Sequence, residues 1–214
     1  MLIHIRRAVV LALIVLVLTF AYTYLSTGIS QVVFKHQANG SITTNGSTLI
    51  GQDWSQTRCP GHPLGSCVFQ GRPDNLGPYA GSANPVAAGG DNPLQANNVP
   101  GRPAVLNSGE SGASNLGPRS STLKSNTEAL VAYWRARGVN PTPDLVTTSG
   151  SGYDPDISAA DALAEIPMVA EATGVSPAAL RALVASQNNG AQLGFLGSSY
   201  INVLQLNEAL VKLR

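Results

Sequence analysis

The stretch RRAVVLALIVLVLTFAYTYL, residues 6–25, contains a long apolar run, Ala8–Leu25, that has no counterpart later in the chain. At about 1.5 Å of rise per residue, this run spans about 27 Å as a helix, close to the thickness of the hydrocarbon core of a bilayer. Arg6 and Arg7 precede it, and the next Lys or Arg is Lys35. The positive-inside rule therefore predicts a membrane helix with the N-terminus in the cytoplasm and the rest of the chain outside.

A cleaved signal peptide is the competing interpretation of this start. Its apolar core is usually shorter and ends at a site of small residues. Here the bulky residues Tyr22, Tyr24 and Leu25 stand where a cleavage site needs small ones. Tyrosines at this position also suit the membrane interface. The sequence therefore favours a retained anchor.

Charge in the chain is nearly balanced, with 13 Lys and Arg against 12 Asp and Glu, so no basic surface for nucleic acid is predicted. The two cysteines, Cys59 and Cys67, are closely spaced in the part predicted to lie outside, which predicts a disulfide. A metal site with His62 is the alternative. Two Cys and one His make an incomplete zinc ligand set, so no metal site is predicted.

Composition divides the chain after the anchor, because residues 74–121 are crowded with Gly, Pro and Asn and predict a long loop. The predicted fold class is α/β, of the α+β kind, as an extracytoplasmic domain behind a single N-terminal transmembrane helix. The expected parts are a cytoplasmic N-terminus (1–7), the transmembrane helix (8–27), the start of the extracytoplasmic domain with a cysteine-bearing insertion (28–73), the loop (74–121) and a helix-rich α/β core (122–214).

Local patterns predict the elements of this domain. Strands are expected at 32–34, 48–50 and 144–148, and helices at 122–137, at 158–173, from Ser176 onward and at 203–213. Ser158 and Ser176 are predicted N-caps, and Gly138 and Gly174 are predicted helix ends. Pro167 predicts a kink or a break in the helix at 158–173.

Motifs of an ATP-hydrolysing chain do not occur: there is neither a Gly-rich phosphate loop ending in Gly-Lys nor an Asp-Lys-Thr-Gly sequence. Ser149 and Ser151 stand in a Gly-rich turn beside Asp154, the one arrangement that suggests a hydrolase. All histidines precede this turn, His62 being the last, so a serine nucleophile has no evident base. No catalytic residue is therefore predicted.

Further motifs follow the anchor in order. They are Ser26–Gln31, Gln37–Ser41, Gly46–Gln52, Gly71-Arg72-Pro73, Ser111–Pro118, Asp144–Ser158, Leu193–Gly197 and Asn202–Asn207. Together they resemble the C subunit of the Kdp-type bacterial potassium-transporting P-type ATPase. The resemblance implies a non-catalytic accessory subunit of an ATP-driven potassium uptake complex, crossing the bacterial inner (plasma) membrane once. A stand-alone membrane-anchored envelope binding protein is the alternative function.

The same resemblance implies partners and a role. The partners are a channel-like potassium-binding subunit, a P-type ATP-hydrolysing subunit and a small membrane subunit, which this chain is expected to hold together. It is also expected to raise the ATP affinity of the hydrolysing subunit. No firmly bound cofactor is expected, and ATP is the one ligand that the resemblance leaves open. The expected interface residues are Gly71, Arg72, Pro73, Ser111, Ser114, Asn115, Ser149, Ser151, Asp154, Asn202 and Asn207.

The chain departs from the family pattern at three places. Extra residues, including both cysteines, precede Gly71, and a second extension follows Pro73. The family usually has a Gln, linked to nucleotide, and then Arg-Val-Ala in the helix after Ser158. Here those positions are Glu165 and Met168-Val169-Ala170, so the nucleotide role does not carry over residue by residue.

Overall fold

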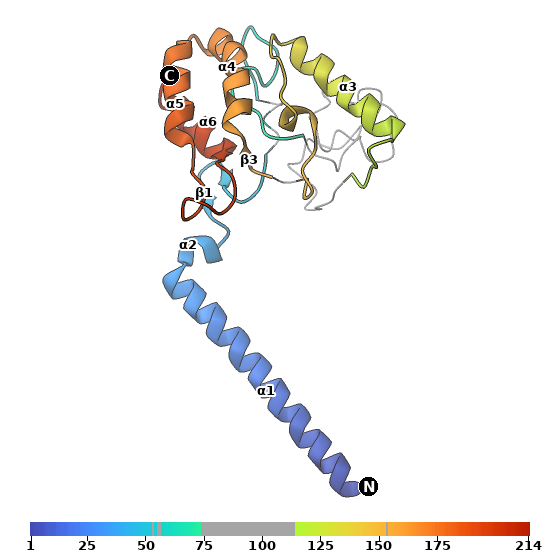
Figure 1. Cartoon of the computed structure of the whole chain (residues 1–214). Coiled ribbons are helices and arrows are strands. Elements are labelled where there is room, and N and C mark those ends of the chain that lie inside the picture. Colours follow the sequence, from blue (N-terminus) through green and yellow to red (C-terminus); the bar gives the residue numbers. More distant parts are fainter. Residues whose placement is uncertain (53, 55–56, 74–113, 153) are drawn as a thin grey trace. The chain divides into compact units, whose positions relative to one another are not determined.

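The computed structural model describes residues 1–52, 54, 57–73, 114–152 and 154–214, and the chain divides into two units (Figure 1). Unit 1 is Met1–Thr44 and unit 2 is Asn45–Arg214. The predicted loop at 74–121 lies mostly outside the described residues. The expected division of the chain at the membrane boundaries stays a prediction.

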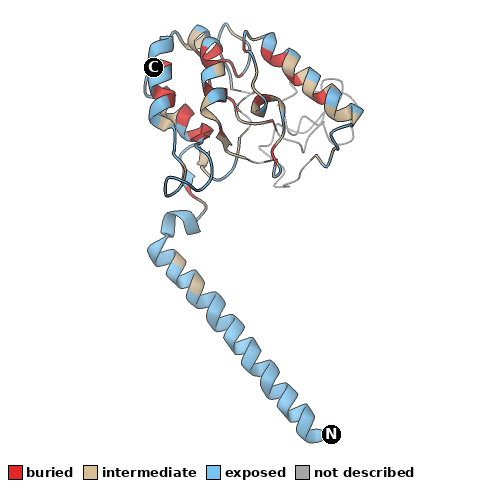
Figure 2. Ribbon diagram, viewed as in Figure 1, coloured by how far each residue is buried: buried red, intermediate tan, exposed pale blue. Residues whose placement is uncertain are grey.

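Unit 1 is dominated by one long helix, α1 (Leu2–Val33), followed by α2 (Lys35–Ala38) and strand β1 (Ile42–Thr43). Within the described part of the chain, α1 is the one helix long and apolar enough to cross a membrane. None of its residues is buried, and Figure 2 shows it exposed along nearly its whole length. An apolar surface of this length requires lipid or protein around it, so the structure agrees with a single membrane anchor.

The strand expected at residues 32–34 is wrong, because Val32 and Val33 form the last turn of α1. Adding one residue to an existing helix gains a hydrogen bond at little entropic cost, and no Gly or Pro interrupts Ile29–Val33. The helix outweighs the strand preference of two adjacent valines.

Unit 2 is a mixed helix and strand fold in which helices predominate. Its elements are β2 (Gly46–Ser47), α3 (Ser121–Arg135), the short 3-10 helix η2 (Asp144–Val146), β3 (Asp156–Ile157), α4 (Ala159–Thr173), α5 (Pro177–Gln187), β4 (Ile201–Asn202) and α6 (Val203–Val211). Strands β3 and β4 pair antiparallel, with Ile157 opposite Ile201. The predicted combination of one anchor helix and a mixed α and β remainder is confirmed.

In the core of unit 2, α5 packs against α4, α6 and β4, and α6 also contacts β4 (Figures 1 and 2). Side chains of α3 belong to the same buried cluster. Trp134 of α3 is fully buried, and its indole N–H donates to the carbonyl of Leu145 at 2.9 Å. This bond places η2 against α3. It also explains why the strand expected at 144–148 is wrong: Leu145 enters the core from a tight helical turn that begins after Pro143.

The helix ends follow the capping residues in the sequence. Ser158 caps α4 in a capping box with Asp161, and Gly174 ends it with φ of +73°. Ser176 caps α5, and Pro177 occupies its first position. These predicted boundaries are confirmed because short side chains and glycine satisfy the end groups locally.

Pro167 does not end α4, which continues to Thr173. Proline removes one backbone hydrogen bond from a helix and crowds the preceding turn. Ile166 and Val169, on either side of it, are both buried in the core, so packing offsets that loss. The expected break is wrong.

Candidate functional site

An irregular segment, residues 65–73, passes through unit 2 without joining a sheet and is buried from residue 65 to residue 70. We name it the anchored segment. Buried backbone groups outside regular structure need side-chain partners, since unpaired ones cost free energy. One of those partners, Asn207, is a residue that the sequence singled out for an interface.

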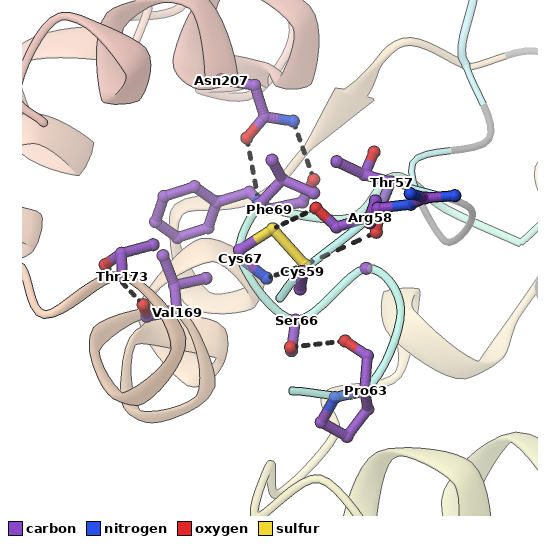
Figure 3. The surroundings of a disulfide bond; sticks show 12 residues. Thr57, Arg58, Cys59, Pro63, Ser66, Cys67, Phe69, Val169, Thr173 and Asn207 are labelled. Carbon is purple, nitrogen blue, oxygen red and sulfur yellow. Dashed lines mark hydrogen bonds between the residues drawn. A yellow bond between two sulfur atoms is a disulfide. The ribbon is translucent and has the colours of Figure 1, made fainter. Parts of the chain in front are cut away.

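Asn207 of α6 fastens the middle of the anchored segment. Its side-chain carbonyl oxygen accepts from the N–H of Phe69 at 2.8 Å, and its amide nitrogen donates to the carbonyl of Phe69 at 2.9 Å. Figure 3 shows this two-bond contact beside the Phe69 ring. The amide thus satisfies both polar groups of one residue, as a neighbouring strand does in a sheet.

Glu165 of α4 holds the next residue, because one of its carboxyl oxygens accepts from the N–H of Gln70 at 2.8 Å. The side chain is fully buried, and its other oxygen has no partner. Burial raises the pKa of Glu165 well above its usual range; the Gln70 N–H lowers that pKa, and the nearby charge of Asp161 raises it further. Met168, the second departure from the family pattern, is also buried.

The structure joins Cys67, in the buried part of the anchored segment, to Cys59 in a disulfide (Figure 3). Both cysteines are buried. The guanidinium of Arg214 donates to the carbonyl of Cys67. The segment therefore enters the core from a covalently closed loop.

Arg72 holds the far end of the anchored segment. Its guanidinium lies 3.3 Å from a carboxylate oxygen of Asp154 and also donates to the carbonyl of Thr148 at 3.3 Å. Gly71 is half-buried and Pro73 is buried. Two of the predicted interface positions, Arg72 and Asp154, thus meet each other inside unit 2.

The two predicted serines lie together in a turn. The hydroxyl of Ser149 accepts from the N–H of Gly152 at 2.9 Å and lies 3.3 Å from the hydroxyl of Ser151. Ser149 is buried. Its contacts are those of a turn-forming side chain.

Asn202 has a similar local role, because it caps α6 by accepting from the N–H of Gln205. Its amide also donates to the carbonyl of Thr48 at 2.8 Å and to Asp156 at 3.1 Å. Burial raises the pKa of Asp156, while the Asn202 contact lowers it. Asn202 thus joins three separate parts of unit 2.

Of the remaining predicted positions, Ser111 lies outside the described residues. The hydroxyl of Ser114 accepts from the N–H of Leu116, and Asn115 has φ of +53°. No group of three His, Cys, Asp or Glu side chains suited to a metal ion occurs among the residues that the structure describes. The side chains around the anchored segment make hydrogen bonds that connect separate regions of unit 2.

Sequence reasoning missed Phe69 and Gln70, whose backbone groups receive these contacts. Nothing local marks them, because their partners Glu165 and Asn207 lie 95 and 138 residues away. It also missed the exposure of Leu193 and Phe195, which project from a loop between α5 and β4. The sequence signal for this exposed loop was Phe195-Leu196 between Gly194 and Gly197, since glycines favour a turn.

Comparison with known proteins gives a consistent result. A family model described as "KdpC: K+-transporting ATPase, c chain" matches residues 5–212. The potassium-transporting ATPase KdpC subunit of Sorangium cellulosum is 40% identical over 222 residues, which cover 98% of each chain. The subunits of the same name from Methylobacterium nodulans and from Rhodopseudomonas palustris strain TIE-1 are each 38% identical, over 98% and 97% of their own lengths and 100% and 98% of this chain.

Proposed function

Because this chain belongs to the KdpC family, the c chain of K+-transporting ATPases, we propose that it is a non-catalytic accessory subunit that assembles the other chains of the complex. As a c chain it is one part of a multi-subunit ATPase that transports potassium. The proposed partners are a channel-like potassium-binding chain, an ATP-hydrolysing chain and a small membrane chain.

The observation that carries the proposal is the exposed surface of α1. A shallow hollow on one side of this helix has the small residues Ala8, Ala12 and Thr19 in its lining, together with Leu11, Val15, Leu16 and Phe20. Small side chains let a second membrane helix approach closely, which is how helices associate in lipid. The hydroxyls of Thr19 and Thr23 donate to carbonyls one turn earlier, so their polar groups are satisfied without water.

The proposed orientation places unit 2 outside the cytoplasm. It is supported by Arg6 and Arg7 before the apolar run and by a disulfide after it, since disulfides persist in oxidising compartments. In this orientation unit 2 is separated from cytoplasmic ATP. The burial of Glu165 and Met168 also keeps these side chains from a ligand. We therefore assign any effect on ATP affinity to assembly of the complex and not to direct contact with the nucleotide.

Co-purification in mild detergent tests the proposal. The tagged full-length chain is expected to retain the other ATPase chains, and Ala12→Leu is expected to lower that retention by filling the hollow. Ala21→Leu is the matched control, since Ala21 does not line the hollow. Purification of the wild-type chain alone would favour a stand-alone envelope protein and contradict the assembly role.

The orientation has its own test. Protease added to intact spheroplasts is expected to cut unit 2, whereas Met1–Arg7 is reached only after the membrane is opened. Protection of unit 2 in intact spheroplasts would overturn the proposed orientation.

A further inference from the structure

The loop between α5 and β4 carries the two most exposed large apolar side chains among the described residues of unit 2. Leu193 is 82% exposed and Phe195 is 75% exposed, and Leu196 beside them is also exposed. A soluble surface rarely leaves neighbouring large apolar side chains in water without a partner. We name residues 192–196 the apolar tip.

The apolar tip is held in place by its own backbone. Asn189 and Tyr200 exchange two backbone hydrogen bonds, of 2.8 and 3.0 Å, at the base of the loop. Gln192 and Leu196 exchange two more, both of 2.9 Å, at its end. The loop is thus a narrow ribbon rooted in α5 and β4, and its side chains are presented in a defined arrangement. Preorganised side chains lose less entropy on binding than mobile ones do.

The backbone at the tip is one that leucine disfavours. The turn from Gln192 to Phe195 has two central residues with positive φ, Leu193 at +54° and Gly194 at +83°. Such turns prefer Asn-Gly, because asparagine tolerates positive φ and leucine does not. The chain therefore carries an apolar side chain where turn formation alone favours a polar one. Strained residues of this kind gather at functional sites.

We propose that the apolar tip is a docking element that inserts Leu193 and Phe195 into an apolar pocket on another chain of the same ATPase. The inference rests on the proposed function, because it names the part of unit 2 through which assembly occurs. Contact centres of protein interfaces are poor in charge and rich in aromatic residues. Between Arg181 and Glu208 the chain has no charged side chain at all.

The same lack of charge argues against a lipid surface as the occupant. Segments that settle on a bilayer combine apolar residues with Lys or Arg that attract anionic headgroups. The tip and its supporting ribbon contain neither. Membership of a multi-chain ATPase supplies protein partners for it instead.

Two variants separate docking from folding. Leu193→Asn removes the apolar side chain and installs the preferred Asn-Gly turn, so the free chain is expected to melt at the same temperature or higher. Phe195→Ser removes the second anchor. Leu163→Gln is the matched control, because Leu163 is an isolated apolar side chain on α4 and is 46% exposed.

The experiment purifies the ATPase through a tag on another chain and measures how much full-length c chain remains bound as the detergent concentration rises. Loss of an interface hot spot weakens binding about thirtyfold or more, so the double variant Leu193→Asn with Phe195→Ser is expected to dissociate while Leu163→Gln behaves as wild type. Wild-type-like retention of the double variant overturns the inference. Failure of the wild-type chain to co-purify contradicts the proposed function itself.

A photo-crosslinking benzophenone side chain in place of Phe195 identifies the occupant directly. Crosslinks to another chain of the ATPase, absent when the same group replaces Leu163, support the inference. Crosslinks to lipid, to a second copy of this chain, or to nothing overturn it.

Discussion

The anchored segment and the apolar tip differ in where their large apolar side chains lie, buried in the first and exposed in the second. The anchored segment buries Phe69 and ties its backbone to Asn207 and Glu165, which come from two different helices. The tip pairs its backbone with itself and leaves Leu193 and Phe195 in solvent. Polar groups in the first region therefore stabilise the fold. The exposed apolar side chains of the second direct attention to a partner.

The largest expected effect breaks the anchored segment at Asn207. Asn207→Ala leaves both backbone groups of Phe69 buried without partners, at a cost of about 1–3 kcal/mol for each group. The free energy of unfolding is expected to fall by about 2–6 kcal/mol, measured by thermal denaturation of the full-length chain in detergent micelles.

The control for this variant is Ser176→Ala, which removes the exposed N-cap of α5. Loss of an N-cap costs about 1 kcal/mol, so its effect is expected to be clearly smaller. Equal effects of the two variants would contradict the special role of the Phe69 contact.

The disulfide ranks next, because it closes the loop that leads into the anchored segment. Closing a loop this short restricts the unfolded chain and so stabilises the folded state by about 2–3 kcal/mol. The double variant Cys59→Ala with Cys67→Ala is expected to lose that stability and to become insensitive to dithiothreitol. Wild-type protein whose melting temperature does not change on reduction would contradict this expectation.

Capping residues were readily predicted from the sequence, whereas the burial and the contacts of the anchored segment were not. Ser158, Gly174 and Ser176 set helix ends through contacts within a few residues, so the chemistry of one position was enough. Val32 and Asp144 were misassigned because local strand preference lost to helix propagation in one case and to the burial of Leu145 in the other.

The candidate site was harder still. Asn202, Asn207 and Asp154 stood out in the sequence, and so did Arg72, the partner of Asp154, but the sequence did not predict which residues pair. Asn207 meets Phe69 across 138 residues of sequence, and such a pairing leaves no local pattern. Several positions predicted for an interface make contacts within unit 2, and their role at an interface stays a prediction.

Glu165 allows a test of the anchored segment by pH. Its pKa is raised in the folded protein by burial, so the folded state holds a proton that the unfolded state releases at lower pH. Stability is therefore full below the pKa of an unfolded-chain glutamate and falls as pH rises toward the raised pKa, by up to about 1.4 kcal/mol per pH unit.

Glu165→Gln keeps an acceptor for the Gln70 N–H and carries no charge. The variant is expected to match wild type in acid and to exceed it in stability as pH rises from about 5 to 8, the range just above the pKa of a free glutamate. Denaturation curves of both proteins across that range provide the measurement. Parallel pH profiles would show that Glu165 does not bind the extra proton in the folded state.

The smallest expected effect is on the free energy of unfolding when Leu193 of the apolar tip is changed, and the test depends on whether that free energy rises or falls. Leu193 occupies a left-handed backbone conformation that costs a branched side chain about 1 kcal/mol or more. Leu193→Asn is therefore expected to raise the free energy of unfolding by about 0.5–1 kcal/mol, whereas Leu193→Val, branched at Cβ, is expected to lower it by a similar amount. The docking inference predicts the reverse order for retention in the complex, because valine keeps an apolar side chain and asparagine does not. If stability and retention instead change in the same direction for both variants, the leucine serves the fold of unit 2, and the contrast between its two regions disappears.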